Sequence, residues 1–167
     1  MGEFRLQALD PAAAERLSLN DLISLEDAPN LSDIGEHVRD LARSTVELYR
    51  RRQSVSPWLG YLCRDDSDCV VGTAAFVGPP TSGAVEIAYH TFPGFEGRGI
   101  ATAMAEQLLE IARQADPSVR VIAYTSPEKN ASTRILERIG FARSGEGIDE
   151  EIGQTWRWEF SNPGARS

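Results

Sequence analysis

Apolar and polar residues alternate at the start of the chain and then recur at helical spacing. The alternation along residues 4–9 predicts a short strand. Asp10 followed by Pro11 is typical of a helix N-terminus, because Asp caps the first amides and Pro fits the first helical position. A second helix is predicted from Ser32, where apolar side chains recur in steps of four and three residues. Those side chains are Ile34, Val38, Leu41, Thr45 and Leu48.

The middle of the chain changes to strand-like patterns. Residues 58–63 and 69–77 predict two strands that an acidic turn joins into a hairpin. A turn rich in Gly and Pro occupies residues 78–83, and residues 84–92 then predict a third strand.

Helical and strand patterns alternate in the second half. Residues 100–115 place apolar side chains on one stripe, which predicts an amphipathic helix. Residues 119–125 predict a buried strand, and a short helix opens at Asn130 or Ala131 and ends at Gly140. The stripe of the long helix consists of Met104, Leu108, Ile111 and Ala115.

The chain is predicted to finish with two strands, residues 141–144 and 155–160, around an acidic loop. The element order is then β-α-α-β-β-β-α-β-α-β-β. This order indicates the α+β class, with a mixed, mostly antiparallel sheet flanked by helices. A chain of 167 residues predicts one domain, over residues 1–161, and a flexible tail at residues 162–167.

Charge and hydropathy narrow the classes of partner. The formal net charge is −8, and neither half of the chain has an excess of basic residues, which argues against nucleic-acid binding. A cationic or amine-bearing partner suits this field better. The longest uncharged run, residues 69–85, is broken by Gly and Pro and cannot span a membrane.

The cysteines indicate a reducing compartment. Cys63 and Cys69 form no CxxC pair, and no signal-peptide pattern precedes them. We therefore expect free thiols, a cytoplasmic protein and no bound metal.

The segment with the clearest chemistry lies between a predicted strand and a predicted helix, at residues 91–102. Gly97 and Gly99 allow the backbone to approach a ligand closely, and the helix N-terminus presents unpaired N–H groups. This combination predicts an anion site for which pyrophosphate is the natural ligand, with added contacts from Arg98 and Thr102. The alternative is an ordinary glycine-rich turn. The spacing fits neither the P-loop nor the GxGxxG pattern.

Residues 96–101 resemble the acetyl-CoA-binding motif of the GNAT superfamily of N-acetyltransferases, Gln/Arg-x-x-Gly-x-Gly/Ala. Gly99 and Ala101 match the motif, whereas Glu96 departs from its first position. Further blocks resemble the same family, most closely the branch that includes ribosomal-protein N-terminal acetyltransferases. These blocks are residues 85–89, 127–141 and 155–160, and the resemblance covers about residues 58–160.

The resemblance implies direct transfer of an acetyl group from acetyl-CoA to a primary amine, either a protein N-terminus or a small amine. In this family the strand before the motif separates from the next strand, and the pantetheine arm lies in the gap. The family would place backbone groups of His90, Thr91 and Phe92 on pantetheine, and Asn130 on the cofactor from the later helix. The pyrophosphate residues would be Gly97, Arg98, Gly99, Ile100, Ala101 and Thr102. Dimers are common in the family, so a homodimer is a further expectation.

Acetyl transfer calls for a base and a proton donor. An alkyl ammonium has a pKa near 10.4, so a base assists at neutral pH. We expect Glu86 in this role, although a carboxylate that pairs with a neighbour is the alternative. Many family members carry a Tyr as general acid where this chain has Leu136, and Tyr124 is the predicted substitute, with a packed Tyr as its alternative. His90 is also open to a structural interpretation.

Two other functions stay open on the sequence. The Leu at position 136 and the Glu at position 96 would also suit a catalytically weak acyl-CoA sensor or interaction module on the same fold. The same anion site would suit a nucleotide-binding domain. The acidic loop, residues 145–151, is either a solvated hairpin loop or a collar that attracts a cationic amine.

Overall fold

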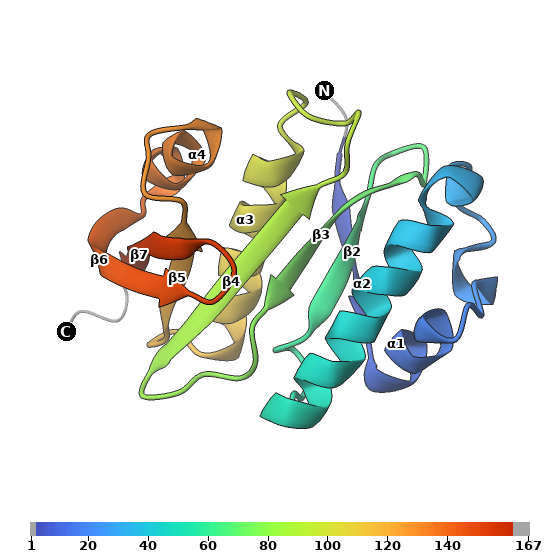
Figure 1. The fold of residues 1–167 in the computed structure, drawn as a ribbon, viewed down its shortest axis with the longest axis horizontal. Helices are drawn as coiled ribbons and strands as arrows, with labels where there is room; N and C mark the ends of the chain where they lie inside the picture. The colour runs from blue at the N-terminus through green and yellow to red at the C-terminus, as the bar shows by residue number, and fades with distance from the viewer. Residues whose placement is uncertain (1–2, 162–167) are drawn as a thin grey trace.

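The described part of the chain, residues 3–161 of the computed structural model, is built on a seven-stranded sheet with the order β1-β2-β3-β4-β5-β7-β6 (Figure 1). The strands are β1 (Arg5–Leu9), β2 (Gly60–Arg64), β3 (Val70–Phe76), β4 (Ala84–Thr91), β5 (Arg120–Thr125), β6 (Ala142–Asp149) and β7 (Gly153–Ser161). The helices are α1 (Pro11–Ser18), η1 (Ile23–Leu25, a 3-10 helix), α2 (Leu31–Arg52), α3 (Ile100–Ala115) and α4 (Ala131–Ile139). The tail predicted at residues 162–167 lies outside the described residues.

Antiparallel pairing runs through the sheet except at one seam. Strands β1 to β4 are successive antiparallel neighbours, and β7 pairs antiparallel with both β5 and β6. Within residues 3–161, only β4 and β5 run parallel. The predicted α+β class and the predicted order of helices and strands are confirmed, and the structure adds η1.

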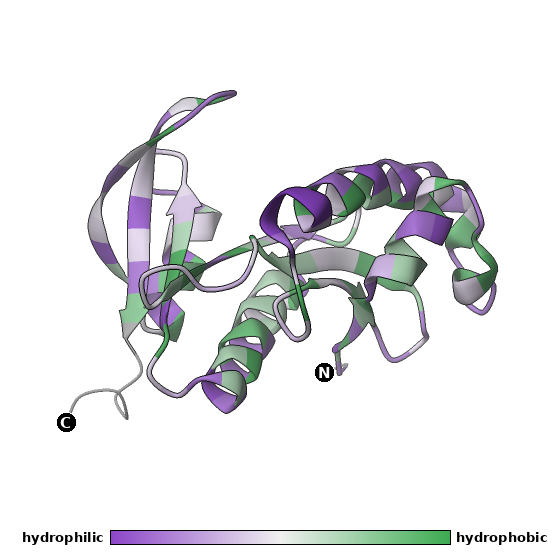
Figure 2. Cartoon of the chain, turned by 90° about the horizontal axis from the view of Figure 1, so that it is seen from below, coloured by the Kyte–Doolittle hydropathy of each residue, from purple (hydrophilic) through white to green (hydrophobic). Residues whose placement is uncertain are grey.

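Two helical layers cover opposite faces of the sheet, as Figure 2 shows from below. On one face, Ile34 and Val38 of α2 pack with Phe92, which follows β4. On the other face, Met104 of α3 packs with Ile87 of β4. Even-numbered and odd-numbered positions around β4 therefore point into different layers, because side chains alternate along a strand.

The buried stripe of each long helix differs from the predicted one. In α2 the buried stripe continues through Ala42 and Tyr49, whereas Leu41 and Leu48 are only half-buried. Tyr49 is buried because its hydroxyl donates to the Leu9 carbonyl and accepts from the Gly60 amide, both at 2.7 Å. In α3 the predicted Ala115 is exposed and Ala112 is buried instead. Both shifts follow the helical period of 3.6 residues, which a step of three or four only approximates.

The predicted acidic loop at residues 145–151 is mostly strand, which corrects that expectation. β6 continues to Asp149 and pairs with β7 up to a short turn that ends at Gly153. Cross-strand contacts extend the pairing: Glu146 lies opposite Trp156, and the Arg143 guanidinium lies 3.9 Å from the centre of the Trp156 ring. The turn is closed by Asp149, whose carboxylate accepts from the amides of Glu151 and Ile152.

Candidate active site

The parallel seam between β4 and β5 is short, and this creates the site. Residues Ala84–Glu86 of β4 pair with Arg120–Ile122 of β5, and the pairing stops there. On its other edge, β4 stays paired with β3 as far as Thr91. The edge of β4 that faces β5 is therefore open from Ile87 onward, so that main-chain groups along it have no ladder partner.

The first hollow at this opening is the glycine cleft, between the end of β4, the start of α3 and one face of α4. It is lined by Tyr89, His90, Thr91, Phe95, Glu96, Gly97, Gly99, Ile100, Ala101, Thr102, Ala131, Ser132, Ile135 and Arg138. Gly97 and Gly99 both have φ of +79°, in the left-handed region that favours glycine. A Cβ built on either glycine meets nothing within 4 Å, so the space beside the backbone is open to a ligand.

The N-terminus of α3 faces this cleft with unpaired amides. The N-cap is Gly99, which has no side chain to cap the helix. The first hydrogen bond of the helix is donated by Ala103 to the Gly99 carbonyl. Within residues 3–161 the amides of Ile100, Ala101 and Thr102 have no acceptor. These amides and the positive end of the helix dipole together favour an anion such as pyrophosphate.

The positively charged side chain at the glycine cleft is not the one that was expected. Arg98 does not line the cleft; its guanidinium lies 5.2 Å from the centre of the Phe95 ring. Arg138 of α4 does line it, although this residue was not predicted from the sequence. Arg138 lies on the same face of the helix as Ala131 and Ile135. This face lines the cleft because α4 packs beside α3, which the sequence does not show. The Glu96 carboxylate accepts from the Gly94 amide at 2.9 Å and so holds the loop.

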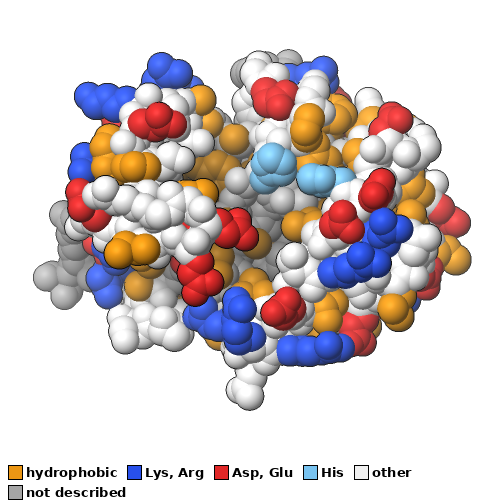
Figure 3. Space-filling model, viewed as in Figure 1, with side chains coloured by type: hydrophobic (Ala, Val, Ile, Leu, Met, Phe, Trp, Pro, Cys, Tyr) orange, Lys and Arg blue, Asp and Glu red, His pale blue; other side chains and the backbone are white. Residues whose placement is uncertain are grey.

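The residues predicted to contact pantetheine are divided by the structure. His90 and Thr91 line the glycine cleft. Phe92 does not: its side chain is 2% exposed, its amide donates to the Val71 carbonyl and its carbonyl accepts from the Phe95 amide. Phe92 belongs to the α2-side core because it follows β4 on the even-numbered face. The chain has two histidines, His37 on α2 and His90, and the centres of their rings lie 5.9 Å apart. Figure 3 shows them at the rim of a central hollow.

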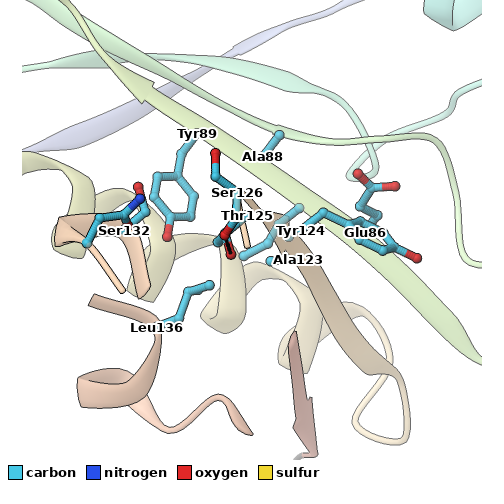
Figure 4. A pocket seen from close by; sticks show the side chains of 11 residues that line it. Glu86, Ala88, Tyr89, Ala123, Tyr124, Thr125, Ser126, Ser132 and Leu136 are labelled. Atoms are coloured by element: carbon cyan, nitrogen blue, oxygen red, sulfur yellow. Dashed lines mark hydrogen bonds between the residues drawn. The ribbon is translucent and has the colours of Figure 1, made fainter. Parts of the chain in front are cut away.

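The second hollow, the split pocket, lies where β4 and β5 separate (Figure 4). It is lined by Glu86, Ile87, Ala88, Tyr89, Ala123, Tyr124, Thr125, Ser126, Asn130, Ser132 and Leu136. Asn130 therefore lines the split pocket and not the glycine cleft. It also starts α4 with a capping box, in which its side chain accepts from the Thr133 amide at 3.1 Å and its own amide donates to the Thr133 hydroxyl at 2.9 Å.

Glu86 and Tyr124 lie at one end of the split pocket, as Figure 4 shows. Burial raises the pKa of Glu86 above its ordinary value, the positive charge of Arg52 lowers it, and the negative charge of Asp149 raises it. Glu86 pairs in register with Ile122, so Tyr124, two residues further along β5, points to the same face of the sheet as Glu86. Tyr124 is 41% exposed and packs against Gly147 of β6, where an added Cβ would lie 2.9 Å from the ring.

Tyr89 and Ser132 lie at the other end of the split pocket and also line the glycine cleft, so the two hollows adjoin there. Tyr89 was not predicted from the sequence to line the site. Alternation along a strand puts Tyr89 on the opposite side from Glu86, but it carries no information on where two strands separate. Leu136, where the resemblance would place a general-acid Tyr, is fully buried beneath this end of the pocket.

Metal binding and membrane insertion are two other classes of function. Within residues 3–161 no cluster of three or more His, Cys, Asp or Glu side chains is arranged to hold a metal ion. Among the helices of the same residues, none combines the length and the hydropathy needed to cross a bilayer.

Comparison with known proteins identifies relatives of the chain. A family model described as "Acetyltransferase (GNAT) domain" matches residues 5–142. An uncharacterized N-acetyltransferase of Bacillus subtilis, YnaD, is 30% identical over 80 residues, which cover 48% of this chain and 47% of that protein. The match to this curated relative therefore spans about half of its length.

Solved structures share the fold over almost the whole chain. The ribosomal-protein-S5-alanine acetyltransferase of Vibrio fischeri has a TM-score of 0.66 at 14% identity and covers 100% of both chains. RimL, a ribosomal L7/L12 alpha-N-protein acetyltransferase solved with coenzyme A, has a TM-score of 0.64 at 18% identity, over 95% of this chain and 93% of its own. A chimera of the spermidine N-acetyltransferase SpeG from Vibrio cholerae and hSSAT has a TM-score of 0.64 at 14% identity, over 95% of each chain. At these identities the likeness establishes the fold.

Proposed function

The chain belongs to the GNAT family of acetyltransferases, and from this premise we propose that it transfers an acetyl group from acetyl-CoA directly to a primary amine. The acceptor is a protein N-terminus or a small amine. One observation carries the proposal: a cleft of unpaired helix amides adjoins a pocket that contains a half-buried carboxylate, at the point where β4 and β5 separate.

The glycine cleft suits the phosphates of coenzyme A. The amides of residues 100–102 would hold the pyrophosphate, with Arg138 as the nearby cation. The open edge of β4 would bind the amide groups of the pantetheine arm, because main-chain N–H and C=O groups need partners. Acetyl-CoA supplies an activated thioester, and an acidic chain with a net charge of −8 can still bind this anion through backbone amides.

Glu86 suits the acceptor side of the reaction. The attacking amine must be neutral, and Glu86 would accept its proton directly or through one water molecule. A general base works best when its pKa lies near the working pH, and burial moves the pKa of Glu86 in that direction. Tyr124, on the same face, would contact the acceptor or the acetyl group.

The acceptor class rests on charge and on the relatives. RimL is named for acetylation of a ribosomal protein and SpeG for acetylation of spermidine, and both names describe amine acceptors. An amine carries positive charge before it reacts, which suits the negative net charge of this chain. We place the reaction in the cytoplasm, because Cys63 and Cys69 are free thiols, as expected in a reducing compartment.

The proposal is tested by binding and by thiol release. Calorimetric titration with coenzyme A should give saturable binding, and ATP should not compete at similar concentration. Incubation with acetyl-CoA and a panel of N-terminal peptides, polyamines and amino acids should release CoA thiol in proportion to one class of acceptor. Binding without release across the panel would support the acyl-CoA sensor instead, and absence of binding would exclude both.

A further inference from the structure

Arg52, in the last turn of α2, is a half-buried cation without a counter-ion. Within residues 3–161, three other arginines are also at least half-buried, and each of them has a partner. These are Arg39 with Glu36, Arg64 with Asp27, and Arg157 with Ser144. Arg52 forms no ion pair and no side-chain hydrogen bond in this part of the chain. A half-buried cation has lost part of its hydration, so one that lacks a partner favours an incoming anion.

The guanidinium of Arg52 rests on the turn that follows β3. Gly78 lies in this turn with φ of +84°. A Cβ built on Gly78 would lie 2.8 Å from Cζ and 2.9 Å from Nε of Arg52, so any side chain at position 78 would displace the guanidinium. The end of α2 also carries Arg50 and Arg51, both exposed, so favourable charge at the helix C-terminus does not require a third arginine held on a glycine.

This turn lies beside Glu86. The amide of Val77, the residue before Gly78, donates to the Glu86 carbonyl at 2.8 Å and so continues the pairing of β3 with β4. Glu86 points to the face of the sheet that α2 covers, and the positive charge of Arg52 acts on it although the two form no ion pair. Figure 3 shows acidic side chains over the β6–β7 hairpin on one side of the central hollow and basic side chains below it, near the end of α2.

A cation at this place works against an acceptor that carries only positive charge. An alkyl amine arrives as an ammonium, and Arg52 repels it near the carboxylate that should receive it. A polyamine carries further positive charges and is repelled more. An acceptor with a carboxylate close to its amine gains instead, because the planar guanidinium can donate two parallel hydrogen bonds to one carboxylate.

We propose that Arg52 binds a carboxylate of the acceptor, so that the preferred substrate is a primary amine with an acid group close to the amine. This inference rests on the acetyl-transfer function proposed above and narrows its acceptor. Glu86 takes the amine end and Arg52 the acid end. Two sources share this chemistry: a free amino acid, through its own carboxylate, and a polypeptide whose first residue is acidic.

The test compares pairs of acceptors that differ in the acid group. One pair is alanine and alaninamide; the other is a peptide that begins with Asp and the same peptide with Asn in its place. Calorimetry measures the binding of each to the protein saturated with coenzyme A, which has no acetyl group to transfer. In the wild type, the acidic member of one pair should bind about tenfold more tightly than the neutral member, and that pair identifies the source.

Variants assign this preference to Arg52. Arg52→Gln should abolish it, whereas Arg51→Gln removes an exposed neighbouring charge and should keep it. Any effect of Arg52→Gln on Glu86 acts on both members of a pair, so the ratio of their affinities reports the carboxylate contact. Gly78→Ala should weaken the preference by displacing the guanidinium. Gly83→Ala is its matched control, because Gly83 lies in the same turn with φ of +79° and an open Cβ position.

Binding and turnover together separate the two proposals. The inference is overturned if the wild type prefers the acidic member of neither pair, or if Arg52→Gln keeps the preference. Release of CoA thiol with equal kcat/KM for the acidic and neutral members would also overturn it, and would leave the proposed function standing. A preference that depends on Arg52, without acetylation of any acceptor, would refute the proposed function and leave the carboxylate site standing.

Discussion

The glycine cleft and the split pocket adjoin at Tyr89, yet they are built from different parts of the chain. The glycine cleft presents main-chain amides from a helix N-terminus. It therefore requires glycines, whose lack of a side chain leaves the space beside the backbone open. The split pocket presents side chains, and its chemistry depends on the charge and burial of Glu86. The difference predicts that the cleft is sensitive to backbone geometry and the pocket to single functional groups.

The largest expected effect tests the cleft. Gly97→Val should weaken coenzyme A binding about 100-fold or more in calorimetry, because a side chain would fill the open space and displace charge-assisted amide contacts. Gly83→Val is the matched control. Gly83 also has φ of +79° and an equally open Cβ position, but it lies outside both hollows. If both variants lose the same thermal stability but only Gly97→Val loses coenzyme A binding, the result supports an anion site at the glycine cleft. If both variants lose binding equally, the result contradicts it.

The next effect tests the pocket. Glu86→Gln should lower kcat about 100-fold, the scale of one general base, while coenzyme A still binds as in the wild type. Glu106→Gln, on the exposed side of α3, removes the same charge outside both hollows and should leave kcat unchanged. Unchanged turnover in Glu86→Gln would remove the assignment of Glu86 as the base.

Two opposite charge changes should move the pH profile in opposite directions. A base is active when deprotonated, so kcat falls as the pH drops through the pKa of Glu86. Arg52→Gln removes a charge that lowers this pKa and should shift the fall to higher pH. Asp149→Asn removes a charge that raises it and should shift the fall to lower pH, while its side-chain oxygen still closes the turn. Arg51→Gln removes a neighbouring positive charge that does not act on Glu86, so it is the control and should not shift the pH profile. If both test variants shift the profile in the same direction, the loss of kcat at low pH does not arise from protonation of Glu86.

A smaller effect concerns the departure from the family motif. Glu96 lines the glycine cleft with a negative charge where phosphates would bind. Glu96→Gln keeps an oxygen that can accept from the Gly94 amide and removes the charge. Coenzyme A affinity should rise about threefold, the scale of an exposed charge pair, and less so at high salt. A decrease in affinity would mean that the carboxylate itself orders the loop.

The smallest effect is on stability. A raised pKa in the folded state means that Glu86 stabilises the fold when protonated, and that this contribution is lost as the pH rises through that pKa. Glu86→Gln should therefore melt at a higher temperature than the wild type at neutral pH, by less than about 4 °C. The difference in melting temperature between Glu86→Gln and the wild type should disappear when both are melted at a pH below the ordinary pKa of a glutamate. A gap that persists in acid would have a cause other than the carboxylate charge.

Sequence patterns predicted the elements well and the outlines of the site in part. The α3 N-terminus and its glycines were identified because local chemistry determines them: Gly97 and Gly99 adopt a backbone conformation that other residues avoid. Phe92 was expected to offer backbone groups to pantetheine, but its amide and carbonyl are already paired with Val71 and Phe95, which adjacency in sequence to His90 and Thr91 could not show. Arg138 and Tyr89 were missed because each looks like an ordinary helix or strand residue until its neighbour across the cleft is known.

Alternation, helical period and turn residues are properties of a few consecutive positions, so the chain itself determined the strands, the helices and the amide-rich start of α3. The parting of β4 and β5 after three paired residues depends instead on how distant segments pack, and only the folded protein could show it. That parting makes Glu86 and Tyr89 members of one pocket from opposite faces of a sheet, since a closed ladder would have kept them apart.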